Sequence, residues 1–128
     1  MALLFGIIEF SWIFNQVLDV RHGSREGARL VAVNYQAGSS PTAQTAAIIA
    51  TICARVDEPS KVRVTITLET AGADEPGDVA FVRVERDLEQ LTGFFDVFLQ
   101  NVQPNAETAF LLEQNATWSP SVGETACP

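Results

Sequence analysis

The sequence contains few of the residues that carry metal and acid–base chemistry. One histidine, His22, and two cysteines, Cys53 and Cys127, occur in 128 residues. A histidine-rich metal site and a four-cysteine zinc site are therefore excluded. Basic residues are also scarce, eight against sixteen acids, and the formal net charge is -8. Because a nucleic-acid backbone is bound by a basic surface, this charge argues against nucleic acid as a partner.

Catalytic motifs are missing as well. The sequence has no phosphate-binding glycine loop and no Rossmann glycine pattern. His22 has only Ser24 near it in sequence, and residues two apart point to different sides of a helix, so the two form no base–nucleophile pair. We therefore expect a protein that is not an enzyme, with no cofactor, no metal ion and no small-molecule substrate.

The acids are concentrated in the C-terminal part of the chain. Residues 1–56 hold four arginines against three acids, a balance of +1, whereas the remaining residues hold four basic residues against thirteen acids, a balance of -9. Hydrophobic residues make up 47 % of the whole, which excludes a disordered acidic chain. This asymmetry predicts an N-terminal part that is buried in lipid or in other subunits, followed by a soluble acidic head.

Apolar residues dominate the first 20 positions, and no proline interrupts residues 1–40. Their spacing of three and four predicts one long helix from about residue 2 to about residue 36, roughly 50 Å in length. The unbroken apolar run ends at Glu9 and is shorter than the roughly 20 residues of a membrane span. Two interpretations remain open: the end of a membrane helix that begins upstream, or an amphipathic core helix.

Small and basic residues follow on the same predicted helix. Gly23 and Gly27 have the small-xxx-small spacing that lets helices approach closely, and Ala28 lies beside them. A basic stripe recurs at every fourth position: Arg21, Arg25 and Arg29. The stripe either meets acids of a neighbouring subunit or forms a solvated helix face just beyond a membrane.

The rest of the chain predicts an α+β head. Ser40 is placed to cap a helix that has Pro41 at its first position, and Asp87 with Gln90 forms a capping-box-like start for another. Strict alternation of apolar and polar residues predicts half-buried strands. In chain order we expect a helix over 42–55, strands over 61–69 and 79–86, a short helix over 88–100, a strand over 107–118 and a tail over 119–128.

The two cysteines predict a staple between the tail and the core. Cys53 lies on a predicted helix, and Cys127 is one residue from the last position of the sequence. A disulfide between them implies an oxidising, extracytoplasmic compartment. The alternative is two free thiols, one buried and one exposed.

The segments 6–10 (GIIEF) and 25–29 (REGAR) resemble motifs of the TadE/TadG-like minor pilins, or pseudopilins, of bacterial tight-adherence (Tad, Flp-type) pili. The resemblance covers residues 3–33. It implies a type IV pilin-like fold, with a long N-terminal spine helix over 1–36 and a globular head over 37–128. The head would carry a small antiparallel sheet of three to four strands with accessory helices. Family members begin with a basic leader, a prepilin-peptidase site and a longer apolar run, so we expect the spine to start upstream of Met1.

The resemblance also implies a function. The chain would be a structural subunit whose partners are other pilin subunits, the pilus assembly machinery and, through its N-terminal helix, the membrane. It would lie in the inner membrane with an extracytoplasmic head, or in the extracellular pilus. The spine residues expected to pack are Leu3, Leu4, Phe5, Ile7, Ile8, Glu9, Phe10, Ile13, Phe14 and Val17. As a carboxylate in an apolar helix, Glu9 is expected to find a partner. The alternative is an extracytoplasmic binding module for which the helix is only a tether.

Overall fold

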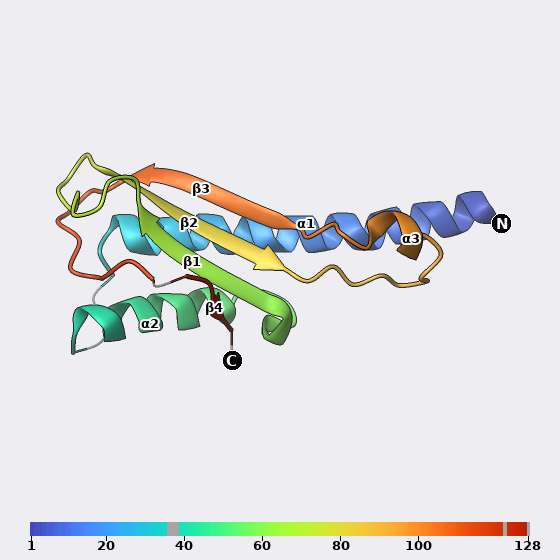
Figure 1. Ribbon diagram of the computed structural model, residues 1–128, viewed down its shortest axis with the longest axis horizontal. Coiled ribbons are helices and arrows are strands. Elements are labelled where there is room, and N and C mark those ends of the chain that lie inside the picture. Colours follow the sequence, from blue (N-terminus) through green and yellow to red (C-terminus); the bar gives the residue numbers. More distant parts are fainter. Residues whose placement is uncertain (36–38, 122, 128) are drawn as a thin grey trace.

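A four-stranded antiparallel sheet lies against one long helix and one shorter helix (Figure 1). This computed structural model describes residues 1–35, 39–121 and 123–127. Its α+β architecture, with a long apolar N-terminal helix, agrees with the fold class expected from the sequence. The elements are α1 (Ala2–Ala32), α2 (Pro41–Cys53), the 3-10 helix η1 (Pro59–Lys61), β1 (Val62–Leu68), β2 (Val79–Arg86), α3 (Asp96–Leu99), β3 (Asn105–Leu111) and β4 (Thr125–Ala126).

The sheet has the strand order β3-β2-β1-β4, and every neighbouring pair is antiparallel. In β1 the buried residues Val62, Val64 and Ile66 alternate with more exposed ones, as the period-two pattern predicts. The predicted strand over 79–86 has the same bounds as β2. One face of the sheet is therefore apolar and must be covered.

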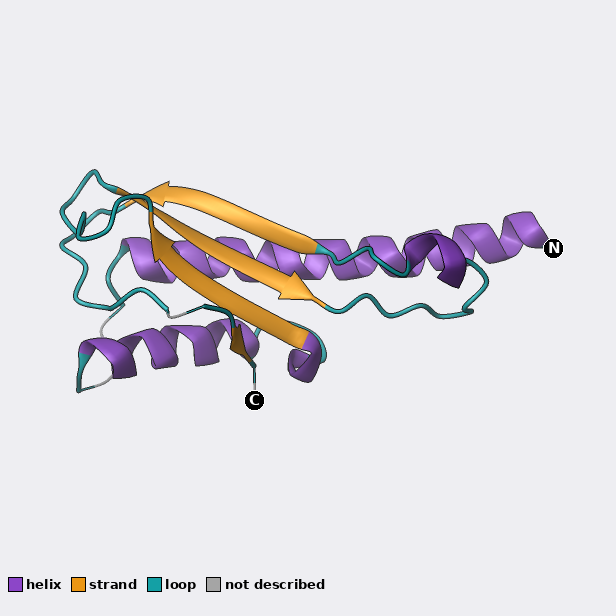
Figure 2. Cartoon of the chain, in the orientation of Figure 1, coloured by secondary structure: helices purple, strands orange, loops and turns teal. Residues whose placement is uncertain are grey.

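Helices α1 and α2 run side by side and provide that cover (Figure 2). α1 contacts β2 and β3, and α2 contacts α1 and β1. Their inward side chains join those of the strands in one core, in which burial of each valine or isoleucine contributes roughly 1.5–3 kcal/mol. The fully buried members of this core are Val20, Val31, Ile48, Ile52, Val64, Ile66, Ala80, Val82 and Val84.

Gly23 and Gly27 allow α1 to approach its neighbours closely. A Cβ at Gly27 would lie 2.6 Å from Cδ1 of Ile52 on α2 and 2.9 Å from Cγ1 of Val82 on β2. A Cβ at Gly23 would lie 2.9 Å from Cγ1 of Val56. The small-residue spacing thus packs α1 against α2 and the sheet of the same chain.

α1 ends at Ala32, four residues before the predicted end, and residues 36–38 lie outside the described chain. The reason is Asn34, which adopts the left-handed conformation with φ 52°. The backbone N–H of Asn34 donates to Val31 and that of Tyr35 to Leu30, as in a Schellman motif. The Asn34 side chain then accepts hydrogen bonds from Gln44 and Thr117, which secures this end.

α2 begins as predicted. Ser40 is its N-cap, and its hydroxyl accepts a hydrogen bond from the Ala43 N–H at 3.2 Å, with Pro41 at the first helical position. At the other end, Cys53 forms a disulfide with Cys127. The C-terminal segment that this disulfide attaches includes β4, which pairs with the edge of β1. The Cys127 N–H then donates to the Val62 carbonyl.

The predicted helix over 88–100 is wrong, because only Asp96–Leu99 is helical. Asp87 does not cap a helix, and its N–H instead donates to the Lys61 carbonyl. Gly93 adopts a φ of 68°, which interrupts any helix there. The backbone amides of the segment before Gly93 are bonded by side chains of α1, as described below. The strand predicted over 107–118 is also shorter, since β3 ends at Leu111.

Gly27→Ala should lower the free energy of unfolding by about 1–2 kcal/mol. The added methyl group overpacks the contact with Ile52 and Val82, and this cost exceeds the gain in helix propensity from replacing glycine by alanine. Gly6→Ala is the matched control on the same helix, because a Cβ there meets only the Phe95 ring, at 3.8 Å. It should be neutral or stabilising by up to about 1 kcal/mol. Denaturant unfolding followed by circular dichroism measures both. Equal effects of the two substitutions would contradict the close approach at Gly27.

Candidate functional site

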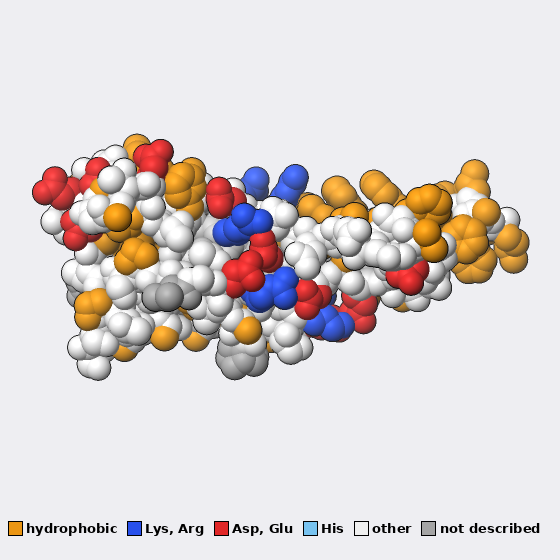
Figure 3. All heavy atoms as spheres, viewed as in Figure 1, with side chains coloured by type: hydrophobic (Ala, Val, Ile, Leu, Met, Phe, Trp, Pro, Cys, Tyr) orange, Lys and Arg blue, Asp and Glu red, His pale blue; other side chains and the backbone are white. Residues whose placement is uncertain are grey.

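The N-terminal half of α1 extends beyond the sheet (Figure 1) and exposes large apolar side chains. Figure 3 shows hydrophobic atoms gathered at this end of the molecule, whereas the acids gather on the head. α1 contains an 18-residue window of mean hydropathy 1.4 that is only 17 % buried, so it is long and apolar enough to cross a membrane. We call the following residues the exposed apolar surface of α1: Leu3, Leu4, Phe5, Ile7, Ile8, Phe10, Phe14 and Leu18.

Seven of the ten spine residues expected to pack belong to this surface. Phe10 and Phe14 stack on each other along it, with ring centroids 6.2 Å apart. Ile13 and Val17 are half-buried, since they point toward the rest of the chain. Glu9 differs from all of these, because it is only 1 % exposed.

Glu9 is bonded by the backbone of its own chain. One carboxylate oxygen accepts from the Leu91 N–H at 3.1 Å. The other accepts from the Thr92 N–H at 2.9 Å and from the Thr92 hydroxyl at 2.7 Å. Charge-assisted bonds of this kind are strong, and the burial of a carboxylate requires them. The partner of Glu9 is therefore the segment between β2 and β3, here called the β2–β3 connection (residues 87–104).

Gln16 makes a second attachment, seven residues further along the same face. Its side-chain amide donates to the Glu89 carbonyl at 2.7 Å, and its carbonyl accepts from the Glu89 N–H at 3.0 Å. The side chain thus pairs with the N–H and the C=O of one residue of the connection, as a residue of a neighbouring strand would. Glu9 and Gln16 together hold the connection along α1.

Asp19 makes a third attachment, through Arg86 at the end of β2. Arg86 is 3 % exposed and donates to the Asp19 carboxylate, to the Asp57 carbonyl and to the Glu58 carboxylate, each at 3.0 Å. Asp19 also accepts from the Asp57 N–H. A buried arginine is tolerated only when it is paired in this way. The network joins α1 to β2 and to the turn after α2.

A surface ion pair lies beside these attachments. The Lys61 ammonium is 2.7 Å from a carboxylate oxygen of Glu89. Its hydrogen bond lowers the pKa of Glu89, and the same bond raises the pKa of Lys61. Both groups are therefore charged at neutral pH, although an exposed pair of this kind adds little stability.

The basic stripe continues the outer side of α1 from the apolar surface. Arg21, Arg25 and Arg29 are all exposed, and no ion pair to them occurs within residues 1–35, 39–121 and 123–127. The opposite face of the same stretch holds Gly23, Gly27 and Ala28, which are buried. α1 therefore presents an apolar and then a basic surface outward.

The attachments through Gln16, Asp19, Arg86 and Thr92 are absent from the sequence-based prediction. One signal for them exists in the sequence: Glu9, Gln16 and Gly23 are spaced by seven, so they share a face of a helix with the buried glycines. The partners of Glu9 and Gln16 lie more than 70 residues away in the sequence, and no local pattern indicates them.

Comparisons with protein-family models, with curated proteins and with solved structures find no match to this chain. In the described part of the chain, no group of three or more histidine, cysteine, aspartate or glutamate side chains is placed to hold a metal ion. The candidate site that the exposed side chains define is the outer side of a long apolar helix whose inner side is fixed to an α+β head. An apolar N-terminal helix together with a disulfide is consistent with membrane attachment and an extracytoplasmic location.

Glu9→Gln should loosen the β2–β3 connection, because an amide offers one acceptor oxygen where the carboxylate offers two. We expect the free energy of unfolding to fall by about 1.5–3 kcal/mol, with faster hydrogen exchange at the Leu91 and Thr92 amides. Glu26→Gln is the matched control, a partly exposed glutamate of the same helix. Unchanged exchange at Leu91 and Thr92 would show that the carboxylate does not hold the connection.

Proposed function

We propose that this chain is a TadE-like minor pilin, a structural subunit that is anchored through α1 and assembles with other pilins of a tight-adherence pilus. The observation that carries the proposal is the exposed apolar surface of α1. It occupies the outer side of a helix whose inner side is fixed by Glu9, Gln16 and the buried glycines. A surface of this kind suits lateral contact with the helices of other subunits.

Physical chemistry supports this use of the surface. A soluble monomer rarely exposes a contiguous apolar patch above a few hundred Å², and here Leu3, Ile7 and Phe10 are each more than half exposed. Removing such side chains from water drives association by about 25 cal/mol per Å². The motifs at 6–10 and 25–29 lie on this same helix, so the resemblance and the exposed surface point to the same element.

Charge supports an ordered contact between copies. The basic stripe lies on the outer side of α1, and the β1–β2 loop carries exposed acids, among them Glu69, Asp74 and Glu75. Figure 3 shows acidic side chains at the end of the head that is farthest from the N-terminus of α1. Staggered copies bring these opposite charges together. Their attraction then sets the register, while the apolar surface supplies affinity.

The double variant Phe10→Ser/Phe14→Ser should reduce pilus assembly in the native host at least about tenfold, because it removes two large side chains from the contact surface. Leu111→Ser on β3 is the control, since Leu111 is equally exposed at 59 % but lies on the head. Electron microscopy and sheared-pilus yield measure assembly. If the double variant assembles normally and its head still recruits a partner, the result would favour the alternative function, a binding module for which α1 is only a tether.

Arg25→Glu should weaken association between subunits about two- to fivefold at low ionic strength, as expected for loss of a surface ion pair. The effect should fade at 1 M salt, where the screening length is about 3 Å. Arg55→Glu is the charge-matched control, an exposed arginine outside the stripe. Cross-linking yields across a salt series report both variants. A salt-independent loss, or an equal loss in both variants, would argue against a charge contact at Arg25.

A further inference from the structure

The β2–β3 connection carries a second apolar surface around α3. Val97 is 77 % exposed, Phe98 80 % and Phe94 58 %. From Gln90 to Gln103 the sequence has one ionisable residue, Asp96, in a protein with sixteen acids. Large side chains this exposed in a segment so low in charge need a nonaqueous neighbour.

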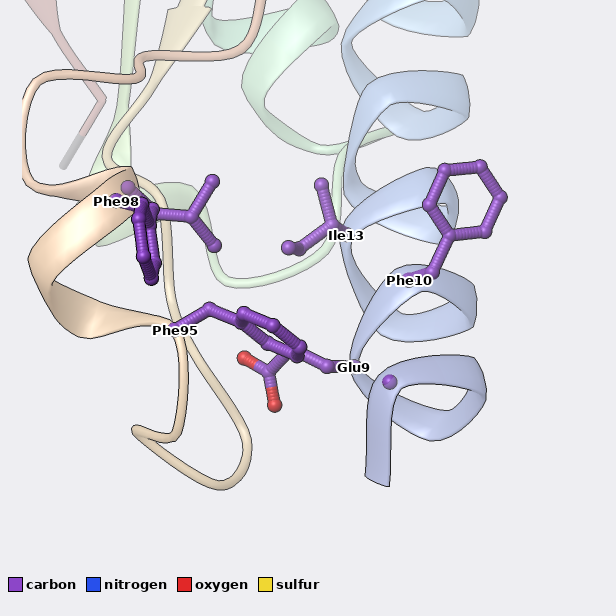
Figure 4. A pocket seen from close by; sticks show the side chains of 7 residues that line it. Glu9, Phe10, Ile13, Phe95 and Phe98 are labelled. Atoms are coloured by element: carbon purple, nitrogen blue, oxygen red, sulfur yellow. The ribbon is translucent and has the colours of Figure 1, made fainter. Parts of the chain in front are cut away.

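This second surface lies directly beside the N-terminal half of α1. The rings of Phe5 and Phe94 stack with centroids 6.4 Å apart, and the Phe95 ring lies against Gly6. Between the two elements is an apolar cavity of about 240 Å³, with Ile13 and Phe98 among the residues that line it (Figure 4). The exposed apolar surface of α1 and the α3 surface are therefore continuous.

The connection is held in this position by α1. Glu9 bonds the backbone of Leu91 and Thr92, and Gln16 bonds the backbone of Glu89. These bonds satisfy backbone groups that lipid cannot satisfy. An irregular segment that is fixed in this way, with these backbone groups already bonded, can approach the boundary between hydrocarbon and headgroups.

We propose that α3 and the neighbouring Phe94 enter the membrane interface beside α1, so that the chain contacts the bilayer at two places, once through α1 and once through the head. The occupant that this surface fits is lipid, because exposed apolar side chains cover more than half of the circumference of the N-terminal part of α1. Leu3, Leu4 and Phe5 are successive residues, which point about 100° apart, and all three are exposed. A protein neighbour covers one side of a helix, whereas a bilayer covers every side that is left open.

The order of charge along α1 fits the same placement. Phe10 is level with α3 across the cavity, and Arg21 lies eleven residues, about 16 Å, further along the helix. Side chains of a helix lean toward its N-terminus. The Arg21 guanidinium is therefore directed toward the level of the lipid phosphate groups. Trp12 then lies between the two, at the depth where interfacial aromatic residues concentrate.

This inference rests on membrane anchoring through α1, which is part of the proposed function, and adds a second contact on the head. Its test uses the full chain reconstituted in phosphatidylcholine vesicles that carry spin-labelled lipid. Phe98→Trp in a Trp12→Phe background is the reporter, and Leu111→Trp in the same background is the control. The buried Trp118 is common to both proteins.

We expect the Phe98→Trp protein to show a blue-shifted emission and at least about twofold stronger quenching by shallow spin labels than the Leu111→Trp protein, because an interfacial segment lies about 5–10 Å deep. Quenching of Trp12 in the native sequence reports α1 separately. Quenching of Trp12 without quenching at position 98 would overturn the contact by α3 and leave anchoring by α1 intact.

Two other results would also overturn the proposal. Absence of quenching at both positions would show that the surface does not meet lipid. The surface would be assigned to contacts between copies of this chain by two results together: Phe98→Ser converts an oligomer in detergent to a monomer, and the Phe98→Trp protein shows no quenching by lipid. Quenching at position 98 together with normal pilus assembly by Phe10→Ser/Phe14→Ser would support the lipid contact while refuting the pilin assignment.

Discussion

The hydrogen bonds that Glu9 accepts from Leu91 and Thr92 determine how the N-terminal half of α1 is used. A carboxylate in an apolar helix must be paired, and this one is paired by backbone amides of its own chain. The helix therefore has an inner side even where it extends past the sheet. The other sides of that half are available for contact with lipid or with other subunits. The position of the exposed apolar surface of α1 and its orientation relative to the head therefore follow from the buried Glu9.

The inner side of α1 changes character along its length. Near the N-terminus Glu9 and Gln16 bond the β2–β3 connection, and then Asp19 joins the Arg86 network. Beyond that, Gly23 and Gly27 let the helix lie against α2 and β2. Polar attachment occurs where the neighbour is an irregular segment, because its backbone groups have no strand or helix partners and need hydrogen bonds. Close packing is used where a layered core is available. The outer side of α1 changes along the same length from apolar to basic. The basic stripe therefore follows the exposed apolar surface along the helix axis.

Local patterns predicted a good part of this structure, and their largest failure, over 88–100, has an identifiable reason. The alternation in β1 and β2 and the Ser40-Pro41 start of α2 are signals carried by neighbouring residues, and all three are observed. The helix predicted over 88–100 has equally good apolar spacing, yet Glu9 bonds the amides of Leu91 and Thr92, which a helix there would use for its own hydrogen bonds. Seven-residue spacing indicates that Glu9 and Gln16 share a face with Gly23. It does not indicate what that face meets.

The sequence by itself determined the α+β class, the long apolar helix and the separation of a neutral half from an acidic one. These properties depend on periodicity and composition, which are local or additive. Only the tertiary structure decided that Glu9 is satisfied within the chain, that the small-residue face is already occupied, and that α3 lies beside α1 as a second apolar surface. Each of these depends on contacts between residues far apart in the chain, and such contacts form only when the backbone has brought both partners together.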